Sequence, residues 1–298
     1  MTKRVKSVLK IAVLIGVGAV GAFVLYALLF GPLFAFSPLK LGFDELRLGR
    51  CSVFYPRETT PDPAYSKADD LMAEAEEFHR LTFKKRVRVI VCATNSQYRR
   101  FSHASGIAST IPTGTVIYIR PSIAEATYPP RIDHQDGKLK LLPPANHANR
   151  DLPSFLKHEL SHAILYQNTT LWKAMKIKRW VEEGLAIYFG NSDHYYARGR
   201  GGDELRVLAI DDGFWFPLTD DEAEPPGIPD GIKHFFSYGV YCGFITYLVD
   251  TYGRDHVLTF VRDYVRAPQN EEALFKKQFA VSLNEAVEGY RKGLSSPR

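Results

Sequence analysis

The sequence contains few cysteines, and none of them are close together. Its three cysteines, Cys51, Cys92 and Cys242, lie far apart and form no C-x-x-C motif. This pattern excludes a disulfide-stapled scaffold and a cysteine-based zinc finger. Cys51 and Cys92 flank opposite ends of two runs that look like neighbouring strands, and parallel pairing of those strands would keep the thiols too far apart to bridge. We therefore expect free or unresolved thiols.

The sequence also lacks a large excess of charge of either sign. Lysine and arginine total 38 against 33 aspartates and glutamates, and the basic residues are spread along the chain. No nucleic-acid partner is therefore expected. Hydrophobic residues make up 45% and charged residues 24% of the 298 positions. This composition excludes disordered and fibrous proteins and allows a sizeable buried core.

One long apolar run, residues 11–30, lies near the N-terminus. As a helix rising about 1.5 Å per residue, its 20 residues would span a hydrocarbon core of about 30 Å. A cleaved signal peptide is the nearest alternative, but its apolar stretch would be shorter and would end at a small-residue site. Four cations precede the run and only Lys40 follows closely, so the N-terminus is expected in the cytoplasm and the body outside it. We expect a single-pass protein of the cytoplasmic (inner) membrane.

Beyond this run, strand and helix patterns alternate. Runs rich in β-branched residues at 51–55, 87–92 and 115–119 predict three strands. Apolar residues at helical spacing predict a helix over 62–83, which makes a β-α-β unit with a further strand. Residues 128–151 hold two proline pairs and no periodicity, which predicts a long loop. The other expected helices cover 152–166, a stretch beginning near 180, and 235–252, 255–265, 271–279 and 283–294.

The pentapeptide His158-Glu159-Leu160-Ser161-His162 falls on the first of the two central helices. Residues four apart lie on one face of a helix with their β-carbons about 6 Å apart, so both imidazoles can bind one metal ion. Glu159 lies at the edge of that face, where it can reach a metal-bound water. A solvated helix face with two histidines would look the same, so the motif needs a further ligand.

A catalytic zinc ion has three protein ligands and one open position. Glu183, in the sequence W-V-E-E-G-L-A at 180–186, lies 21 positions after His162. This spacing lets the chain turn and a second helix pack against the first. Gly184 would let these two backbones approach closely, and Trp180 would anchor the second helix in the core. The neighbouring Glu182 is an alternative ligand.

Taken together, H-E-x-x-H at 158–162 and W-x-x-E-G-x-A at 180–186 resemble the gluzincin metallopeptidases, in particular the compact bacterial peptidase-MA-like domains. The resemblance covers most of the chain from about Cys51 onward. It implies an α+β, zincin-like fold with a small mixed sheet, an active-site helix and a helical C-terminal region. It also implies that a strand at 114–119 lies along the active-site cleft.

The resemblance further implies the roles of individual residues. His158, His162 and Glu183 would bind one Zn²⁺, with Glu183 preferred over Glu182 because it precedes the glycine of the motif. Glu159 would be the general base. Such sites also need a donor for the tetrahedral oxyanion.

Tyr238 is the candidate oxyanion donor, at a position where the family often has a tyrosine. Tyr241 and His234 are its rivals, and a partly buried core aromatic is the alternative reading of Tyr238. One position departs from the family pattern: the residue four after Glu183 is often a supporting carboxylate, but here it is Ile187. Asp193 is the nearest replacement.

The expected organisation has six parts: a basic cytoplasmic N-terminus (1–10), a transmembrane helix (11–30), a linker (31–50), a zincin-like α/β part with the zinc ligands (51–190), an irregular loop (191–233) and a helical part that completes the cleft (234–298).

These observations predict a membrane-anchored zinc metallopeptidase that acts on a peptide or protein substrate. Two alternatives stay open at this point. One is a catalytically silent peptidase-like domain that binds an envelope protein partner. The other is a zinc hydrolase of a non-peptide amide or ester, which the same ligand set allows. The sequence makes no prediction of the oligomeric state.

Overall fold

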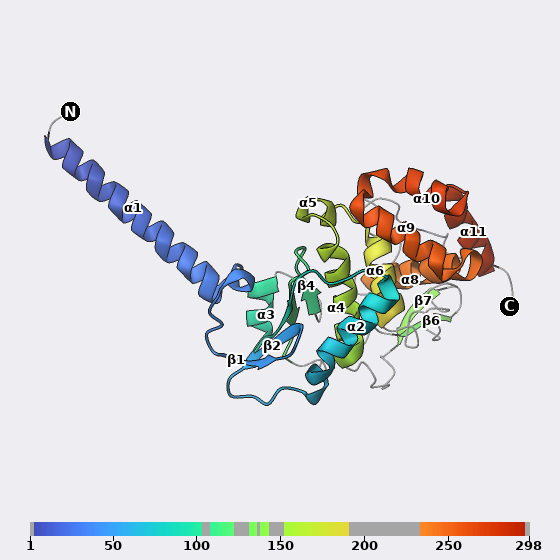
Figure 1. Ribbon diagram of the computed structural model, residues 1–298, viewed down its shortest axis with the longest axis horizontal. Coiled ribbons are helices and arrows are strands. Elements are labelled where there is room, and N and C mark those ends of the chain that lie inside the picture. The colour runs from blue at the N-terminus through green and yellow to red at the C-terminus, as the bar shows by residue number, and fades with distance from the viewer. Residues whose placement is uncertain are drawn as a thin grey trace.

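The computed structural model describes residues 3–102, 108–121, 131–135, 138–142, 152–190 and 233–295. Figure 1 shows a body of helices and strands from which one long helix, α1 (Lys3–Phe30), extends. Its segment Lys10–Phe30 is long and apolar enough to cross a membrane, and only 6% of the tested window is buried. A signal sequence near the N-terminus has the same properties.

The body contains a mixed five-stranded sheet with the strand order β1-β2-β3-β5-β4. The three central strands are parallel, and the two edge strands are antiparallel to their neighbours. In chain order the strands are β1 (Phe43–Arg47), β2 (Cys51–Pro56), β3 (Val87–Val91), β4 (Ala108–Thr110) and β5 (Val116–Ile119).

The predicted β-α-β unit is present, with α2 (Ala68–His79) between β2 and β3. Cys51 pairs with Val87 in the parallel register, so Cys51 and Cys92 lie at opposite ends of the two strands. Cys51 and Cys92 are free, as expected, and so is Cys242; all three are buried.

Helices cover both faces of the sheet. α2 and α4 (Leu152–Gln167) pack on one face, and α3 (Asn95–Ser102) with the 3₁₀ helix η1 (Phe34–Phe36) covers the other. Val89 belongs to the first cluster and its neighbour Ile90 to the second. This alternation follows from the two-residue period of a strand. The sheet is therefore the middle of three layers.

Two stretches expected to be irregular contain strands. The expectation of a loop over 128–151 is wrong for β6 (Arg131–Gln135) and β7 (Lys138–Leu142), which pair in an antiparallel hairpin. The intervening sequence Asp136-Gly137 favours a two-residue hairpin turn. The loop was expected because proline pairs flank this segment on both sides. The stretch 31–50, expected to be a linker, contains η1 and the edge strand β1.

The C-terminal part is helical, as expected. The expected helices correspond to α8 (Lys233–Tyr252), α9 (Arg254–Arg266), α10 (Glu271–Phe279) and α11 (Leu283–Ser295). The remaining described helices are η2 (Pro63–Lys67), α5 (Leu171–Ala174), α6 (Arg179–Gly190) and η4 (Pro268–Asn270).

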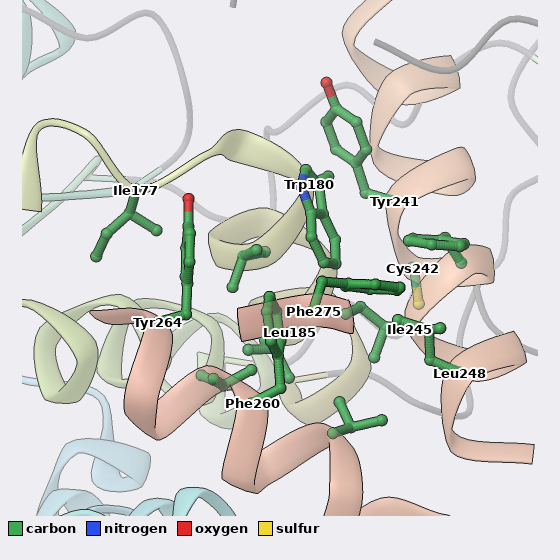
Figure 2. Close-up of a cluster of buried hydrophobic side chains, with 14 of the residues drawn as sticks. Ile177, Trp180, Leu185, Tyr241, Cys242, Ile245, Leu248, Phe260, Tyr264 and Phe275 are labelled. Carbon is green, nitrogen blue, oxygen red and sulfur yellow. The ribbon is translucent and has the colours of Figure 1, made fainter. Parts of the chain in front are cut away.

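A second hydrophobic core joins α6 to these C-terminal helices (Figure 2). Trp180, only 1% exposed, lies at its centre and stacks on Phe260 with ring centroids 6.0 Å apart. Its indole N–H donates a hydrogen bond of 3.0 Å to Glu271. Trp180 therefore anchors the start of α6, as the sequence predicts.

His79, the last residue of α2, is buried against the aromatic rings of Phe78 and Phe189. Among the described residues, neither of its ring nitrogens has a hydrogen-bond partner. Burial, assisted by the charges of His162 and Arg254, lowers the pKa of His79 to about 3. The folded protein therefore keeps this imidazole neutral at pH values where an unfolded chain protonates it.

We expect His79 to make the fold sensitive to acid. Below its unfolded pKa of 6.5 and down to about 3, only the unfolded state binds the proton. As the pH falls through this range, the contribution of His79 to the free energy of unfolding should therefore decrease by about 1.4 kcal/mol per pH unit. His79→Leu should flatten the dependence of unfolding on pH between about 7 and 4.5, measured by thermal unfolding of the full chain in detergent. His256→Leu, at an exposed site on α9, is the control. Equal slopes in wild type and His79→Leu would contradict this account.

Candidate metal centre

The H-E-x-x-H pentapeptide lies on α4, one turn of which separates its two histidines. The Nε2 atoms of His158 and His162 lie 3.2 Å apart. His162 is buried and His158 is partly exposed. The helix therefore directs both rings to one point at the edge of the buried core.

Glu183 reaches the same point from α6. Its Oε2 atom lies 3.4 Å from Nε2 of His158 and 3.5 Å from Nε2 of His162. No hydrogen bond to this buried oxygen is found among the described residues. The three residues together form a group that could hold a metal ion.

The spacing of these three atoms fits a zinc ion. Zinc binds nitrogen and oxygen ligands at about 2.0–2.1 Å in a tetrahedron, which places ligand atoms about 3.3–3.4 Å from one another. The three observed separations are 3.2, 3.4 and 3.5 Å. His158, His162 and Glu183 therefore supply one face of a tetrahedron, and the fourth position belongs to no described ligand of this group.

Close packing of α6 on its neighbours brings Glu183 to the histidines. A β-carbon at Gly190 would lie 2.9 Å from the backbone nitrogen of His158, so α6 approaches α4 at that glycine. A β-carbon at Gly184 would lie 2.8 Å from Ile245 and 2.9 Å from the carbonyl oxygen of Tyr241, both on α8. The expectation that Gly184 allows the approach to α4 is therefore wrong. Gly184 allows the close approach of α8, and Gly190 allows that of α4.

Glu159 lies beside the histidines and is 5% exposed. The hydroxyl of Thr110 on β4 donates a hydrogen bond of 2.6 Å to its carboxylate. The strand in contact with Glu159 is therefore the edge strand β4, whereas β5, which contains most of the expected cleft strand 114–119, lies inside the sheet. The sequence gives no signal for Thr110, because the contact joins residues 49 positions apart.

Tyr238 lies in the site, in contact with the third residue of the group. Its hydroxyl donates a hydrogen bond of 3.1 Å to Oε1 of Glu183, which leaves Oε2 directed at the histidines. Burial and the negative charge of Glu183 raise the pKa of Tyr238 well above its usual range, so this hydroxyl stays protonated. Of its two rivals, Tyr241 is buried in the hydrophobic core of Figure 2, and the side chain of His234 lies outside the described part.

Support from the position four residues after Glu183 is absent, as the sequence suggests. Ile187 is buried in the hydrophobic core, and Asp193, its proposed replacement, lies outside the described residues. Nδ1 of His162 has no hydrogen-bond partner in the described part of the chain. The hydrogen bonds observed at the site go to its carboxylates: Tyr238 on α8 donates to Glu183, and Thr110 on β4 donates to Glu159.

A third carboxylate, that of the partly buried Glu182, lies close enough to His162 for their charges to interact. The Tyr166 hydroxyl donates a hydrogen bond of 2.7 Å to it, and the Tyr166 ring stacks on His162 with centroids 6.0 Å apart. Burial raises the pKa of Glu182 to about 7. Glu182 is therefore bound by Tyr166 and does not belong to the His-His-Glu group.

Charge couples the members of the group. Burial alone would lower the pKa of His162, but Glu183, with Glu159 and Glu182, outweighs burial and raises it to about 9. Burial alone would raise the pKa of Glu183, but His162 and His158 hold it well below its usual range. A site with this many carboxylates around two imidazoles favours a cation at its centre.

Comparisons with known proteins find similarity at the level of solved structures. No protein-family model and no curated protein matches the sequence. The M1 zinc metallopeptidase from Deinococcus radiodurans is similar with a TM-score of 0.41 and 13% identity. A mutant of an M1 zinc metallopeptidase from that organism bound to a Tyr-Ser-Ala substrate has a TM-score of 0.39 and 14% identity. A mutant of a two-domain M1 zinc metallopeptidase bound to L-tryptophan has a TM-score of 0.39 and 13% identity.

Each similarity covers 86% of this chain and 52% of the compared chain, so the protein spans about half the length of these structures. TM-scores near 0.4 are too low to indicate a function, whereas the geometry of the His-His-Glu group does indicate one.

Gly184→Ala should disturb the packing that positions Glu183. The added methyl meets Ile245 and the α8 backbone, and overpacking of this kind costs about 1–3 kcal/mol. Gly293→Ala on α11 is the matched control, because no atom lies within 4 Å of its β-carbon position. Thermal unfolding of the full chain should show a loss for Gly184→Ala and little change or a slight gain for Gly293→Ala. Equal melting temperatures for the two variants would contradict the close approach.

Proposed function

We propose that this protein is a zinc-dependent peptidase, anchored in the cytoplasmic membrane by α1 with its body outside the cytoplasm. One observation supports the catalytic part above all others: the three ligand atoms of His158, His162 and Glu183 are spaced as tetrahedral zinc requires, with Glu159 beside them. The length and apolar character of α1, and the cations before it, support the anchor.

In this proposal a bound zinc ion supplies a Lewis acid, which lowers the pKa of water from about 16 toward about 7 and polarises a carbonyl group. Glu159 accepts the proton of the attacking water and transfers it to the leaving amine. Thr110 orients the Glu159 carboxylate through their hydrogen bond. In this structure Tyr238 donates its one hydroxyl proton to Glu183. It is our candidate donor to the oxyanion of the tetrahedral intermediate, to which that proton would then turn.

The position of Glu159 favours catalysis over silent binding. A recognition domain has no use for a buried carboxylate that a threonine hydroxyl orients beside the ligands. We propose peptide bonds as the substrate because the two sequence motifs, H-E-x-x-H and W-x-x-E-G-x-A, resemble those of metallopeptidases. Small amides and esters belong in the same assay, because the ligand set can hydrolyse them too.

Two substitutions separate metal binding from proton transfer. Glu159→Gln should keep about one zinc per chain and lower peptidase activity by about 10²–10⁴-fold, since only the proton acceptor is lost. His162→Ala should lose both zinc and activity. Elemental analysis and cleavage of a peptide library by the full chain in detergent measure these outcomes, with His256→Ala as the control. Absence of zinc from well-folded wild type, or wild-type cleavage by Glu159→Gln, would overturn the proposal.

Thr110→Val should lower kcat with little change in KM, because the hydrogen bond that orients Glu159 acts on the chemical step. Loss of about 1–1.5 kcal/mol corresponds to about a tenfold decrease. Thr110→Ser keeps the hydroxyl and should restore most of the rate. A Thr110→Val enzyme as active as Thr110→Ser would exclude this positioning role.

A further inference from the structure

A compact group of exposed apolar side chains lies on the connection between α4 and α6. Leu171, Trp172 and Met175 are 47%, 74% and 53% exposed. The first two belong to α5, and Met175 follows it. Exposed tryptophan and leucine in contiguous positions are unusual on a water-facing surface and mark a contact with another apolar phase or partner.

This apolar group is held rigidly by the body. Ala174 is buried, as is Ile177 two residues beyond Met175. The Lys173 side chain donates a hydrogen bond of 2.6 Å to the carbonyl of Arg266 at the end of α9. The exposed side chains are therefore presented outward by a fixed turn.

The surrounding sequence carries charge of one sign only. Between Glu159 and Glu182 there is no acidic residue, whereas four cations follow Trp172 within seven positions. Of these, Lys176 is exposed. Apolar side chains with adjacent cations are typical of segments that bind the interface of an anionic membrane.

The orientation of the body relative to α1 is fixed where α1 ends. Phe34, four residues beyond α1, is 1% exposed and stacks on Phe101 of α3 with ring centroids 4.2 Å apart. Lys40 closes this turn by donating to the carbonyl of Ser37 at 2.8 Å. The described contacts thus join the end of α1 to the sheet layer without a free linker.

With this orientation, α5 projects from the body on the side that faces α1 (Figure 1). The segment that follows α1 also exposes apolar residues, namely Leu33, Phe36, Leu39 and Leu41. Two apolar groups, one at the end of the proposed membrane span and one on α5, therefore lie on one side of the molecule.

We propose that Leu171, Trp172 and Met175 insert into the outer interface of the bilayer that α1 crosses, with Lys176 at the anionic phospholipid headgroups. This inference rests on the membrane anchoring proposed above. Tryptophan favours the headgroup region, and lysine extends its ammonium group toward phosphate. Because α5 joins the helices that carry His162 and Glu183, this second attachment holds the metal centre at a fixed height above the membrane.

Quenching of tryptophan fluorescence by brominated lipids tests the contact directly. The full chain is reconstituted in vesicles of phosphatidylglycerol and phosphatidylcholine with bromine near the headgroup end of the acyl chains. It contains three tryptophans, of which Trp180 is in the core. Bromolipid should quench about one third of the wild-type tryptophan emission, the part that comes from Trp172. Trp172→Phe should lack this quenched component. Equal quenching of wild type and Trp172→Phe would overturn the proposal.

A charge variant tests the role of the headgroups. Lys176→Glu should reduce the Trp172 quenching, whereas Lys277→Glu, an exposed control on α10, should leave it unchanged. Equal effects of the two variants would contradict the proposed headgroup contact. Shielding of Trp172 from aqueous iodide without bromolipid quenching would assign the surface to a protein partner or a second copy, which also overturns the proposal.

Flotation of the same vesicles after alkaline washing distinguishes the two levels of inference. Chains that do not float would refute the anchor in the proposed function. Chains that float without Trp172 quenching would refute only the interfacial contact.

Discussion

The candidate metal centre depends on the packing of α6 between α4 and α8. Gly190 allows the approach to α4, Gly184 allows the approach to α8, and Trp180 fixes the start of α6 in the second core. This packing brings Glu183 to within 3.5 Å of both histidines. A ligand group built from two packed helices is rigid, because neither helix can shift without opening the core between them.

The side chains that orient the group come from elements far away in the sequence. Thr110 reaches Glu159 from the edge strand, and Tyr238 reaches Glu183 from α8. In each case one hydroxyl binds one carboxylate oxygen, which fixes the direction of the carboxylate. Position 187 contributes no such contact, because Ile187 belongs to the core.

Electrostatics favours a cation in the site. Glu159, Glu182 and Glu183 are gathered around two imidazoles in a largely buried volume, and a divalent ion offsets their mutual repulsion. Tyr166 keeps Glu182 apart from the group by a hydrogen bond while its ring lies against His162. The connection through α5 then links this charged centre to the surface that we propose meets the membrane, so that attachment and active site share the same two helices.

The sequence alone determined the features that local periodicity and composition encode. These are the apolar run near the N-terminus, the helix that places His158 and His162 on one face, the β-α-β unit, the free cysteines and the C-terminal helices. It also singled out Glu183 and Tyr238 as candidates, and the structure brings Glu183 to the histidines and Tyr238 to Glu183. Only the tertiary structure decided that Gly190 admits α4, that β4 contacts Glu159, that Tyr166 binds Glu182, and that β1 and the β6–β7 pair are strands. The reason is physical: helix faces repeat within a few residues, whereas strand pairing and helix–helix contact join residues tens of positions apart, which no local pattern specifies.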